Sequence, residues 1–382
     1  MKTLCGLVLE RYKAFFSFAG LKKGNLQLLD EKELSLLSDK SFLRRLKANS
    51  KKIEQLIIDF ERENSLSVEK VFVELPSSLS DEIEAQEKIV FSRKKKVTSS
   101  TINSAKKYIE NKFLEWNQRC IHHIVLDYQA EGVKTNEAPL GVFTNKIKLN
   151  SLITCVKESF YKEVADIFYN MEKDFAGFVA HKMGVLSQGF NCFKGDQVVI
   201  SVNNFRSYAE TKDEKGRVSE KEFSFGMEKI VEKLSKQYAI LPSIAMQLLK
   251  RYGSFKEIPY FKEITIKKHD SYLNLSTKAL GNFLKKTFSS NIKPIIKEAL
   301  EAIKEDRRNQ VVFSFVGPLT IKDGFYGYIK KLLACKIEVP DYKCSSSAFG
   351  CIKYGYFKPL EKAHERKQSL FEKIKKIYHE YF

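Results

Sequence analysis

Short-spaced cysteine pairs and long apolar runs are both missing from this sequence. None of the seven cysteines stands in a Cys-x-x-Cys pair, so the spacing typical of structural zinc sites and redox motifs is absent. We therefore predict reduced and mostly buried thiols, as in a protein of the cytosol. The N-terminal apolar run is too short for a signal peptide or a membrane-spanning helix and favours a first strand. The sequence thus predicts a chain that is made and stays in the cytoplasm.

A metal-binding pattern is missing as well. The two adjacent histidines, His122 and His123, come directly before the strand-like residues 124–128. Successive side chains of a strand point to opposite faces, so the two rings are expected to point apart. We therefore predict no metal site here.

Acidic residues are in deficit. The chain has 66 lysines and arginines against 47 aspartates and glutamates, which gives a formal net charge of +19. A surface this basic favours an anionic partner such as a membrane, a nucleic acid or an acidic peptide, and charge alone does not choose among them. No RNP, helix-turn-helix or zinc-knuckle string is present, so we expect no nucleic-acid partner. With 43% hydrophobic and 12% aromatic residues the chain is predicted to be globular.

Residues 370–382 have the pattern of an amphipathic helix. Apolar residues recur at helical spacing on one side, and mostly lysine and glutamate occupy the other. Such a helix can lie flat on an anionic membrane, with apolar side chains at the acyl boundary and lysines at the head groups. A terminal helix docked on the protein's own core would show the same apolar stripe. The predicted membrane-binding residues are Leu370, Phe371, Lys373, Ile374, Lys375, Lys376, Ile377, Tyr378, Tyr381 and Phe382.

The preceding residues, 358–369, favour the membrane interpretation. They are charged, include Pro359 and lack the apolar spacing needed to pack, so we predict a flexible linker.

The first half of the chain shows the element order of an α/β protein. A β-hairpin is predicted over 3–18, then one long amphipathic helix over 40–64 and a buried strand over 68–75. Residues 77–154 favour a small α+β insert. A helical stretch is predicted over 156–183.

The second half repeats this order in outline. A strand and hairpin begin near Gly195, and a helix-rich region covers about 227–306. Two halves that each start with a hairpin and later become helical weakly indicate an internal duplication.

Several local strings follow one another in an order that resembles one protein family. They are a strand-turn-strand at 6–14, the turn Gly20-Leu21-Lys22-Lys23-Gly24, Asp127-Tyr128 to Gly132, Pro139-Leu140-Gly141, Gly226, residues 245–253 (AMQLLKRYG) and residues 348–354 (AFGCIKY). In this order they resemble the bacterial cell-division protein FtsA, an actin-like family that anchors the tubulin-like FtsZ to the membrane. The resemblance covers nearly the whole chain.

The resemblance implies an α/β, actin-like (ribonuclease H-like) two-lobed fold with an FtsA-type inserted subdomain and a C-terminal amphipathic helix. The implied parts are a first lobe at 1–76, 155–194 and 340–357, an insert at 77–154, a second lobe at 195–339 with a helical subdomain at about 227–306, a linker at 358–369 and the helix at 370–382.

The nucleotide motifs of such a fold are degenerate in this chain. Actin-like ATPases carry Asp-x-Gly strings on two hairpins, whose amides hold phosphates and whose carboxylates position metal and water. Here Val8 occupies the position where the first aspartate would be expected. Residues 199–206 (VISVNNFR), at the second hairpin, have neither glycine nor aspartate. A third, glycine-rich turn keeps only Gly317. We therefore predict a pseudo-ATPase in which side chains fill the cleft.

No cofactor is expected, and binding of ATP with Mg²⁺ is disfavoured. Any residual nucleotide binding would use Lys13, Asn203, Asn204, Arg206 and Gly317. Ordinary hairpin-turn chemistry explains Asn203 and Asn204 equally well.

In the FtsA family the helical subdomain of the second half receives the acidic C-terminal peptide of FtsZ. The matching region here, 273–303, has a basic face made of Lys278, Lys285, Lys286, Lys293 and Lys297. The positions nearest the expected peptide site are Asn282, Lys285, Lys286 and Ser289. A solvated lysine face would look identical.

The favoured hypothesis is an FtsA-like scaffold that tethers an FtsZ-type filament to the inner face of the cell membrane and can self-associate into actin-like filaments. An active actin-like ATPase would need a carboxylate at Val8 or Ile200, which the sequence lacks. A pilus-assembly-type actin-like scaffold is the nearest alternative. The insert and the amphipathic segment favour the division family over it.

Overall fold

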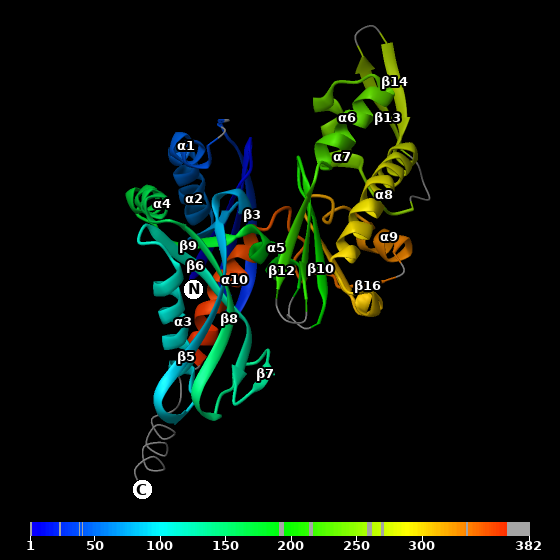
Figure 1. The fold of residues 1–382 in the computed structure, drawn as a ribbon. Coiled ribbons are helices and arrows are strands. Elements are labelled where there is room, and N and C mark those ends of the chain that lie inside the picture. The colour runs from blue at the N-terminus through cyan, green and yellow to red at the C-terminus, as the bar shows by residue number, and fades with distance from the viewer. Residues whose placement is uncertain are drawn as a thin grey trace. The chain divides into compact units, whose positions relative to one another are not determined.

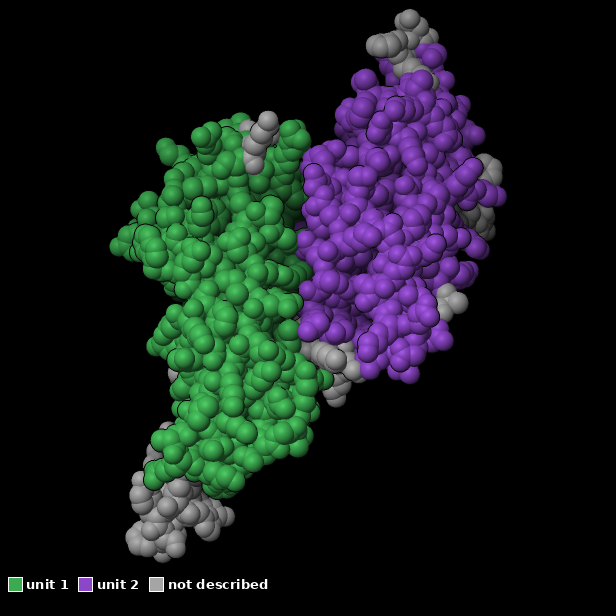
Figure 2. All heavy atoms as spheres, viewed as in Figure 1, with its two compact units in different colours: residues 1–184, 351–382 green, residues 185–350 purple. Residues whose placement is uncertain are grey.

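The chain forms two compact units. The computed structural model describes residues 2–22, 24–37, 39, 41–190, 195–213, 217–257, 262–268, 271–333 and 335–364. Unit 1 comprises residues 1–184 and 351–382, and unit 2 comprises residues 185–350 (Figure 2). The chain crosses between them within α5 (His181–Gly189) and near the start of α10 (Ala348–His364). The lobe borders predicted from sequence, 195 and 339, lie about ten residues from these crossings.

Unit 1 is built on a five-stranded sheet with the order β3-β2-β1-β4-β9 (Figure 1). The first three strands are antiparallel neighbours, whereas β4 runs parallel to β1 and β9 parallel to β4. The strands are β1 (Thr3–Leu9), β2 (Lys13–Lys22), β3 (Asn25–Ser35), β4 (Val68–Leu75) and β9 (Asp174–Ala180). Helices α1 (Phe42–Ala48), α2 (Ser50–Asn64) and α4 (Glu158–Asn170) belong to the same unit. Their apolar stripes and the strands share one core, in which Phe18 stacks on Phe60 with ring centroids 3.8 Å apart.

The single helix predicted over 40–64 is wrong, because the structure has two helices that meet at Asn49. The Asn49 side chain is completely buried and bonds to backbone on both sides of the break. Its Nδ2 donates to the carbonyl of Arg45 (2.8 Å) and of Leu37 (3.2 Å), and its Oδ1 accepts from the Leu37 amide (2.9 Å). An asparagine side chain that bonds locally to the backbone competes with the helical ladder, so the helix ends there.

The helical stretch predicted over 156–183 is also partly wrong. Helix α4 ends at Asn170, and residues Asp174–Ala180 form strand β9, which pairs with β4. The run Phe-Ala-Gly-Phe-Val-Ala is short and continuously apolar, so periodicity alone cannot separate a buried strand from a buried helix.

The insert of unit 1 forms a four-stranded antiparallel sheet with the order β5-β8-β6-β7 and its own small core. The elements are β5 (Asp81–Lys96), α3 (Ser99–Phe113), β6 (Gln118–Ala130), β7 (Val133–Thr135) and β8 (Phe143–Lys157). A capping box between Thr98 and Thr101 starts α3. Ile102, Ala105 and Ile109 of α3 pack in the core of this sheet.

The two adjacent histidines of β6 have different partners, as the alternation of a strand predicts. His122 Nε2 accepts from the Ala180 amide (2.9 Å), whereas His123 Nδ1 lies 2.8 Å from Glu110 Oε1 of α3. The two rings therefore do not converge on one point.

Unit 2 repeats the topology of unit 1. Its sheet has the order β12-β11-β10-β15-β16, with β10, β11 and β12 antiparallel neighbours and with β15 and β16 parallel to β10. The strands are β10 (Gln197–Val202), β11 (Ser207–Lys212), β12 (Val218–Phe223), β15 (Val312–Val316) and β16 (Lys336–Ile337). The same order and directions in both sheets are what an internal duplication predicts, so the hairpins β1–β2 and β10–β11 are topologically equivalent.

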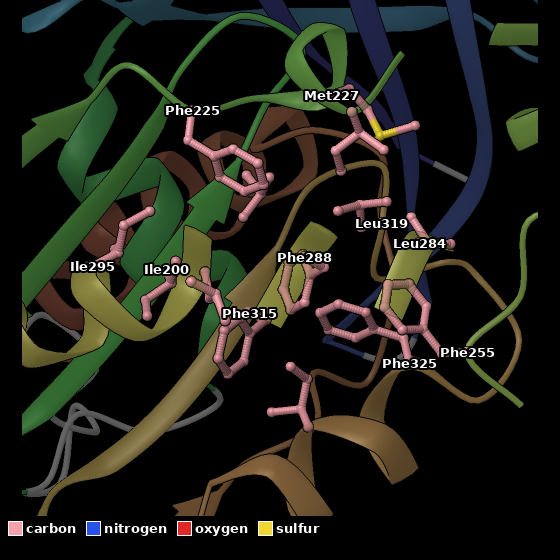
Figure 3. Close-up of a cluster of buried hydrophobic side chains, with 14 of the residues drawn as sticks. Ile200, Phe225, Met227, Phe255, Leu284, Phe288, Ile295, Phe315, Leu319 and Phe325 are labelled. Carbon is pink, nitrogen blue, oxygen red and sulfur yellow. The ribbon is translucent and has the colours of Figure 1, made fainter. Parts of the chain in front are cut away.

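The helices of unit 2 cover a core rich in phenylalanine (Figure 3). They are α6 (Met227–Tyr238), α7 (Pro242–Tyr252), α8 (Thr277–Glu301) and α9 (Phe325–Leu332). The predicted helical region also contains a hairpin, formed by β13 (Glu263–Lys268) and β14 (Ser271–Ser276). Phe288 of α8 is fully buried, and its ring lies 5.5 Å from that of Phe255 and 5.6 Å from that of Phe325.

Helix α10 packs in unit 1 and extends into the predicted linker. A β-carbon at Gly355 would stand 2.3 Å from the ring of Phe72, which explains glycine at this contact. The helix continues to His364, so residues 358–364 of the predicted linker are helical. The remaining linker residues and the amphipathic segment 370–382 lie outside the described residues. Within the described part of the chain, no helix is both long and apolar enough to cross a membrane.

The cysteines agree with the sequence-based expectation of free, mostly buried thiols. Among the described cysteines, Cys5, Cys155, Cys344 and Cys351 are buried and Cys120 and Cys335 are partly exposed, and none of these six forms a disulfide. Burial raises the pKa of the Cys155 thiol to about 11 and also raises the pKa of Cys351. These thiols stay protonated near neutral pH.

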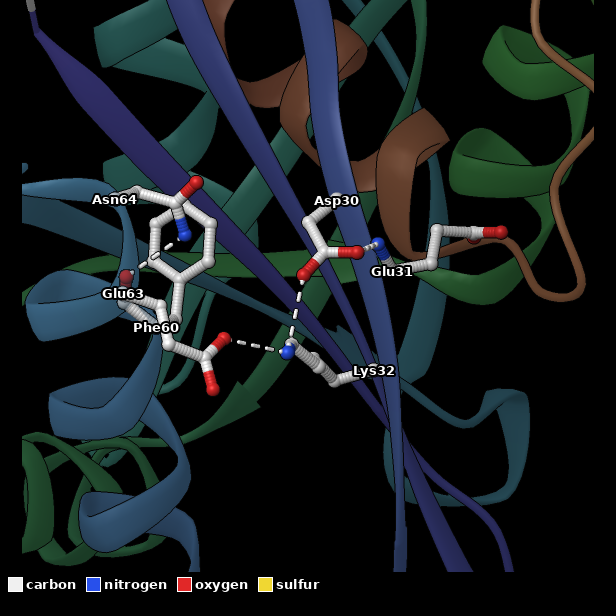
Figure 4. Close-up of polar contacts among 6 residues, drawn as sticks. All are labelled: Asp30, Glu31, Lys32, Phe60, Glu63 and Asn64. Atoms are coloured by element: carbon white, nitrogen blue, oxygen red, sulfur yellow. Dashed lines mark hydrogen bonds and ion pairs between the residues drawn. The ribbon is translucent and has the colours of Figure 1, made fainter.

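Strand β3 is an edge strand that carries charged side chains (Figure 4). Lys32 pairs with Asp30 of the same strand (3.3 Å) and with Glu63 of α2 (2.8 Å). An open groove of about 380 Å³ lies between β3 and α2 and is lined by Lys32, Leu34, Lys52, Gln55, Leu56, Asp59 and Glu63. Charged side chains on an edge strand oppose pairing with a second sheet.

Candidate functional site

The β1–β2 hairpin of unit 1 carries Val8, the residue that was expected from the sequence to replace a metal-organising carboxylate. Its tight turn is closed by the Glu10 amide, which donates to the Lys13 carbonyl (2.9 Å). Val8 pairs across the hairpin with Phe15 and is 6% exposed. Lys13, a predicted nucleotide contact, forms an ion pair with Glu33 of the neighbouring strand β3. The nearest acidic residue of the hairpin is Glu10, two positions beyond Val8.

The equivalent β10–β11 hairpin of unit 2 is bonded to the beginning of α6. The amides of Met227 and Glu228 donate to the carbonyls of Asn203 (3.0 Å) and Asn204 (2.9 Å). The amide of Asn203 itself donates to the carbonyl of Arg206 (3.0 Å). Two of the amides that a helix leaves unbonded at its N-terminus are therefore satisfied by the hairpin. The free amides of a helix N-terminus would attract anions. Here two of these amides already donate to carbonyls of the hairpin.

Glycine at position 226 makes this contact possible. A β-carbon there would stand 2.6 Å from the Asn204 carbonyl oxygen and 2.8 Å from the Arg206 nitrogen. Helix α6 has no side-chain cap at its N-terminus, in agreement with capping by the hairpin. Arg206 also forms an ion pair with Glu222 of β12, so its guanidinium has a partner within unit 2.

Gly317 follows β15 at the same edge of the sheet. Because β10 and β15 are parallel, both strands end there, and Gly317 meets the last residue of β10. Its φ is +109°, and a β-carbon would stand 2.3 Å from the Val202 carbonyl oxygen. Both the amide (3.0 Å) and the hydroxyl (2.8 Å) of Thr320 donate to the Gly317 carbonyl. Close packing of two strands therefore requires glycine here, with no need for a nucleotide.

The structure thus brings four of the five predicted nucleotide contacts together. Asn203, Asn204, Arg206 and Gly317 gather at the carboxyl ends of β10 and β15 in unit 2, whereas Lys13 belongs to unit 1. The recess beside the Gly317 turn is lined by residues that include Phe315, Thr320 and Tyr326, and it has essentially no volume that a water molecule could occupy. Ligand pockets usually have about 300–1,000 Å³, so this recess is too small for a nucleoside.

The predicted peptide site lies on the solvent-facing side of α8. Asn282 and Lys286 are exposed, and Lys285 and Ser289 are partly exposed at positions that share one helix face. Lys285 Nζ donates to the Lys256 carbonyl (3.3 Å). The basic face made of Lys278, Lys285, Lys286, Lys293 and Lys297 has no ion pair within the described residues. The residues therefore form one surface, with positive charge available to an acidic partner.

Sequence reasoning missed the bond between the hairpin and α6. The sequence did carry a signal for this bond, namely the lack of a capping residue before α6. No Ser, Thr, Asp or Asn stands at position 226 to cap α6, so another group had to satisfy its first amides.

Comparison with known proteins identifies the fold. Neither a protein-family model nor a curated protein sequence matches this chain. Among solved structures, the ethanolamine utilization protein EutJ from Carboxydothermus hydrogenoformans matches 93% of this chain and 90% of its own, at 9% identity and a TM-score of 0.52. MreB5 of Spiroplasma citri bound to ADP matches at 12% identity and a TM-score of 0.49, covering 96% of this chain and 98% of its own. The duplicated sheets and the similarity to EutJ show that the chain has the actin-like fold.

Proposed function

We propose that this protein is a non-hydrolysing actin-like scaffold of FtsA type, which holds an FtsZ-type filament at the inner face of a cell membrane. The observation that carries the proposal is the state of the two equivalent hairpins. One presents buried Val8 in place of a metal-organising carboxylate, and the other is bonded through Asn203 and Asn204 to α6. Phosphoryl transfer needs a metal-bound, well-positioned phosphate chain, and neither hairpin supplies the groups for it.

The amphipathic residues 370–382 supply the proposed membrane contact. Their apolar side and their lysines match a helix that lies in the interface of an anionic bilayer. One such helix binds weakly, whereas many helices on a shared filament bind strongly through multivalency. Self-association or filament binding therefore belongs to the same proposal, and the basic face of α8 is the proposed site for an acidic filament peptide.

The membrane contact is tested by the variant Phe371→Glu/Ile374→Glu in the full chain. Burying one large apolar side chain contributes about 1.5–3 kcal/mol, so losing two is expected to weaken vesicle binding at least about 100-fold. Co-sedimentation with vesicles that contain phosphatidylglycerol measures the effect.

A matched control for this test is Tyr272→Glu/Ile321→Glu, which changes two apolar residues that are 72% and 50% exposed in unit 2. It is expected to bind vesicles as the unchanged protein does. Equal sedimentation of the Phe371→Glu/Ile374→Glu variant and the unchanged protein would refute the membrane anchor.

Nucleotide is expected to have little effect on this protein. Addition of ATP with Mg²⁺ should give no phosphate release and a change in Tm below about 1 °C, because a ligand stabilises a protein only if it binds the native state. Phosphate release and differential scanning fluorimetry measure the two quantities. Hydrolysis that disappears in a Lys13→Ala variant would overturn the proposal, since it would place a working nucleotide site at this hairpin.

A further inference from the structure

One end of the insert sheet gathers the ends of several strands (Figure 1). Ile89 of β5 pairs with Ile147 of β8, which pairs with Ala130 of β6, which pairs with Val133 of β7. Beyond this level lie residues 90–97 and 131–146, which we call the basic tip.

Large apolar side chains are exposed on the basic tip. Val90 is 66% exposed, Val133 is 68% exposed and Phe143 is 63% exposed. Leu140 and Val142, in the loop that leads to β8, are 52% and 38% exposed. Single exposed apolar residues are ordinary, but five at one end of a small sheet point to an interaction surface.

The same end is strongly basic. The basic tip contains six lysines and arginines against two acidic residues. Arg93, Lys94, Lys96 and Lys146 are exposed and form no ion pair with any described residue. Lys95 lies over the ring of Phe91, 4.0 Å from its centroid.

The β5–β8 ladder is interrupted within the basic tip. Val90 of β5 is opposite Lys146 of β8, and the next paired residue of β5, Lys95, is opposite Thr144. Phe91–Lys94 therefore have no regular partners in β8 and form an irregularity of the ladder. An interruption of this kind disturbs the ladder and re-aims the side chains of the strand. Here it adds an arginine and a lysine to the end of the sheet.

Hydrogen bonds hold the basic tip in a defined conformation. The Val97 amide donates to the Val142 carbonyl (2.8 Å), and the Gly141 amide donates to the Val97 carbonyl (2.9 Å). The buried hydroxyl of Thr144 donates to the Lys146 carbonyl (2.6 Å). The exposed apolar and basic side chains are therefore presented on an ordered backbone.

We propose that the basic tip is a second contact with anionic lipid head groups, separate from residues 370–382. Aliphatic and aromatic side chains at the ends of protruding strands suit the interface of a bilayer, and the lysines and arginines around them suit its negative head groups. Single-stranded nucleic acid is bound mainly by stacked aromatic rings, whereas four of the five exposed apolar residues here are aliphatic: Val90, Val133, Leu140 and Val142. The inference rests on the proposed function, because it adds a second contact with the membrane that the terminal segment is proposed to bind.

The test reverses charge on the basic tip in the full chain, with Arg93→Glu/Lys94→Glu/Lys96→Glu. Each basic residue near an anionic leaflet strengthens binding by a factor of about five, so the lipid concentration for half-maximal binding is expected to rise about 100-fold. Flotation with phosphatidylglycerol vesicles and with neutral phosphatidylcholine vesicles measures the effect. A second variant, Leu140→Ser/Phe143→Ser, tests the apolar part and is expected to weaken binding at least about 100-fold, because two large apolar side chains are lost.

The matched control is Lys229→Glu/Lys233→Glu/Lys330→Glu, which changes the net charge equally at exposed positions of unit 2. If the control and the tip variant weaken binding equally, net charge alone explains the effect and the inference fails. It also fails if the tip variant binds anionic vesicles like the unchanged protein, or if a single-stranded oligonucleotide competes fully with the vesicles.

Combining the tip variant with Phe371→Glu/Ile374→Glu separates the two membrane contacts. If the terminal variant alone abolishes binding and the tip variant has no effect, the inference is overturned and the proposed function stands. If the tip variant alone abolishes binding and the terminal variant has no effect, the basic tip stands and the proposed terminal anchor fails. If each variant alone weakens vesicle binding in part and the combined variant abolishes it, both membrane contacts are supported.

Discussion

The substitution Gly317→Ala is expected to lower the Tm of the protein by about 10 °C. The φ of +109° is unfavourable for any residue with a β-carbon, and a β-carbon would stand 2.3 Å from the Val202 carbonyl oxygen. Backbone strain costs about 1–3 kcal/mol and a forced shift in a packed region costs about 1–3 kcal/mol more, about 4 kcal/mol together. A unit of this size loses about 2–4 °C of Tm for each kcal/mol. Thermal unfolding followed by circular dichroism measures the shift.

The control for Gly317 is another glycine of unit 2. Gly327 lies in α9, and a β-carbon there meets nothing within 4 Å. Gly327→Ala is expected to stabilise the protein by about 0.5–1 kcal/mol, because alanine has the higher helix propensity. If Gly317→Ala left Tm unchanged, strand packing could not explain glycine at this position, and a ligand contact would become the better reason for it.

Phe288→Ala is expected to destabilise unit 2 by about 3–5 kcal/mol, the usual cost of truncating a buried phenylalanine. The Phe288 side chain is fully buried among the rings of Phe225, Phe255 and Phe325 (Figure 3). Its removal leaves a cavity between α8 and the rest of the core. Urea unfolding gives the change in free energy.

The same helix provides the control for Phe288. Lys286 is exposed, and Lys286→Ala is expected to change the free energy of unfolding by less than about 0.5 kcal/mol. The variants separate two roles of α8, since Lys286→Ala removes charge from the predicted peptide site without disturbing the core. A loss from Phe288→Ala no larger than that from Lys286→Ala would contradict the packing described for α8.

Features with a strong local pattern were predictable from the sequence. The helix Met227–Tyr238 has apolar and charged residues at helical spacing, and it begins where the helix-rich region over about 227–306 was predicted to begin. The two hairpins were also predicted, because each has apolar strands around a short polar turn. Their equivalence became clear only from the pairing of distant strands, β1 with β4 and β10 with β15, which no local pattern encodes.

The errors arose where tertiary contacts decide the local structure. Asn49 divides the helix predicted over 40–64 because it bonds to Leu37, a residue outside that segment. Strand β9 forms because β4 is there to pair with it, although its sequence also suits a helix. The role of Gly226 depends on the backbone of residues 204–206 and could not be derived from its neighbours in sequence.

The hydrogen bonds between the β10–β11 hairpin and α6 bear on how long an assembly of these subunits would persist. In an actin-like filament that hydrolyses a nucleotide, the phosphate group held by such hairpins sets the lifetime of each contact between subunits. Here the Asn203 and Asn204 carbonyls accept from the Met227 and Glu228 amides, which ties the hairpin to the start of α6. Under the proposed function, an assembly of these subunits would not be timed by nucleotide hydrolysis, and its persistence would depend on concentration and on the dissociation rates of its partners.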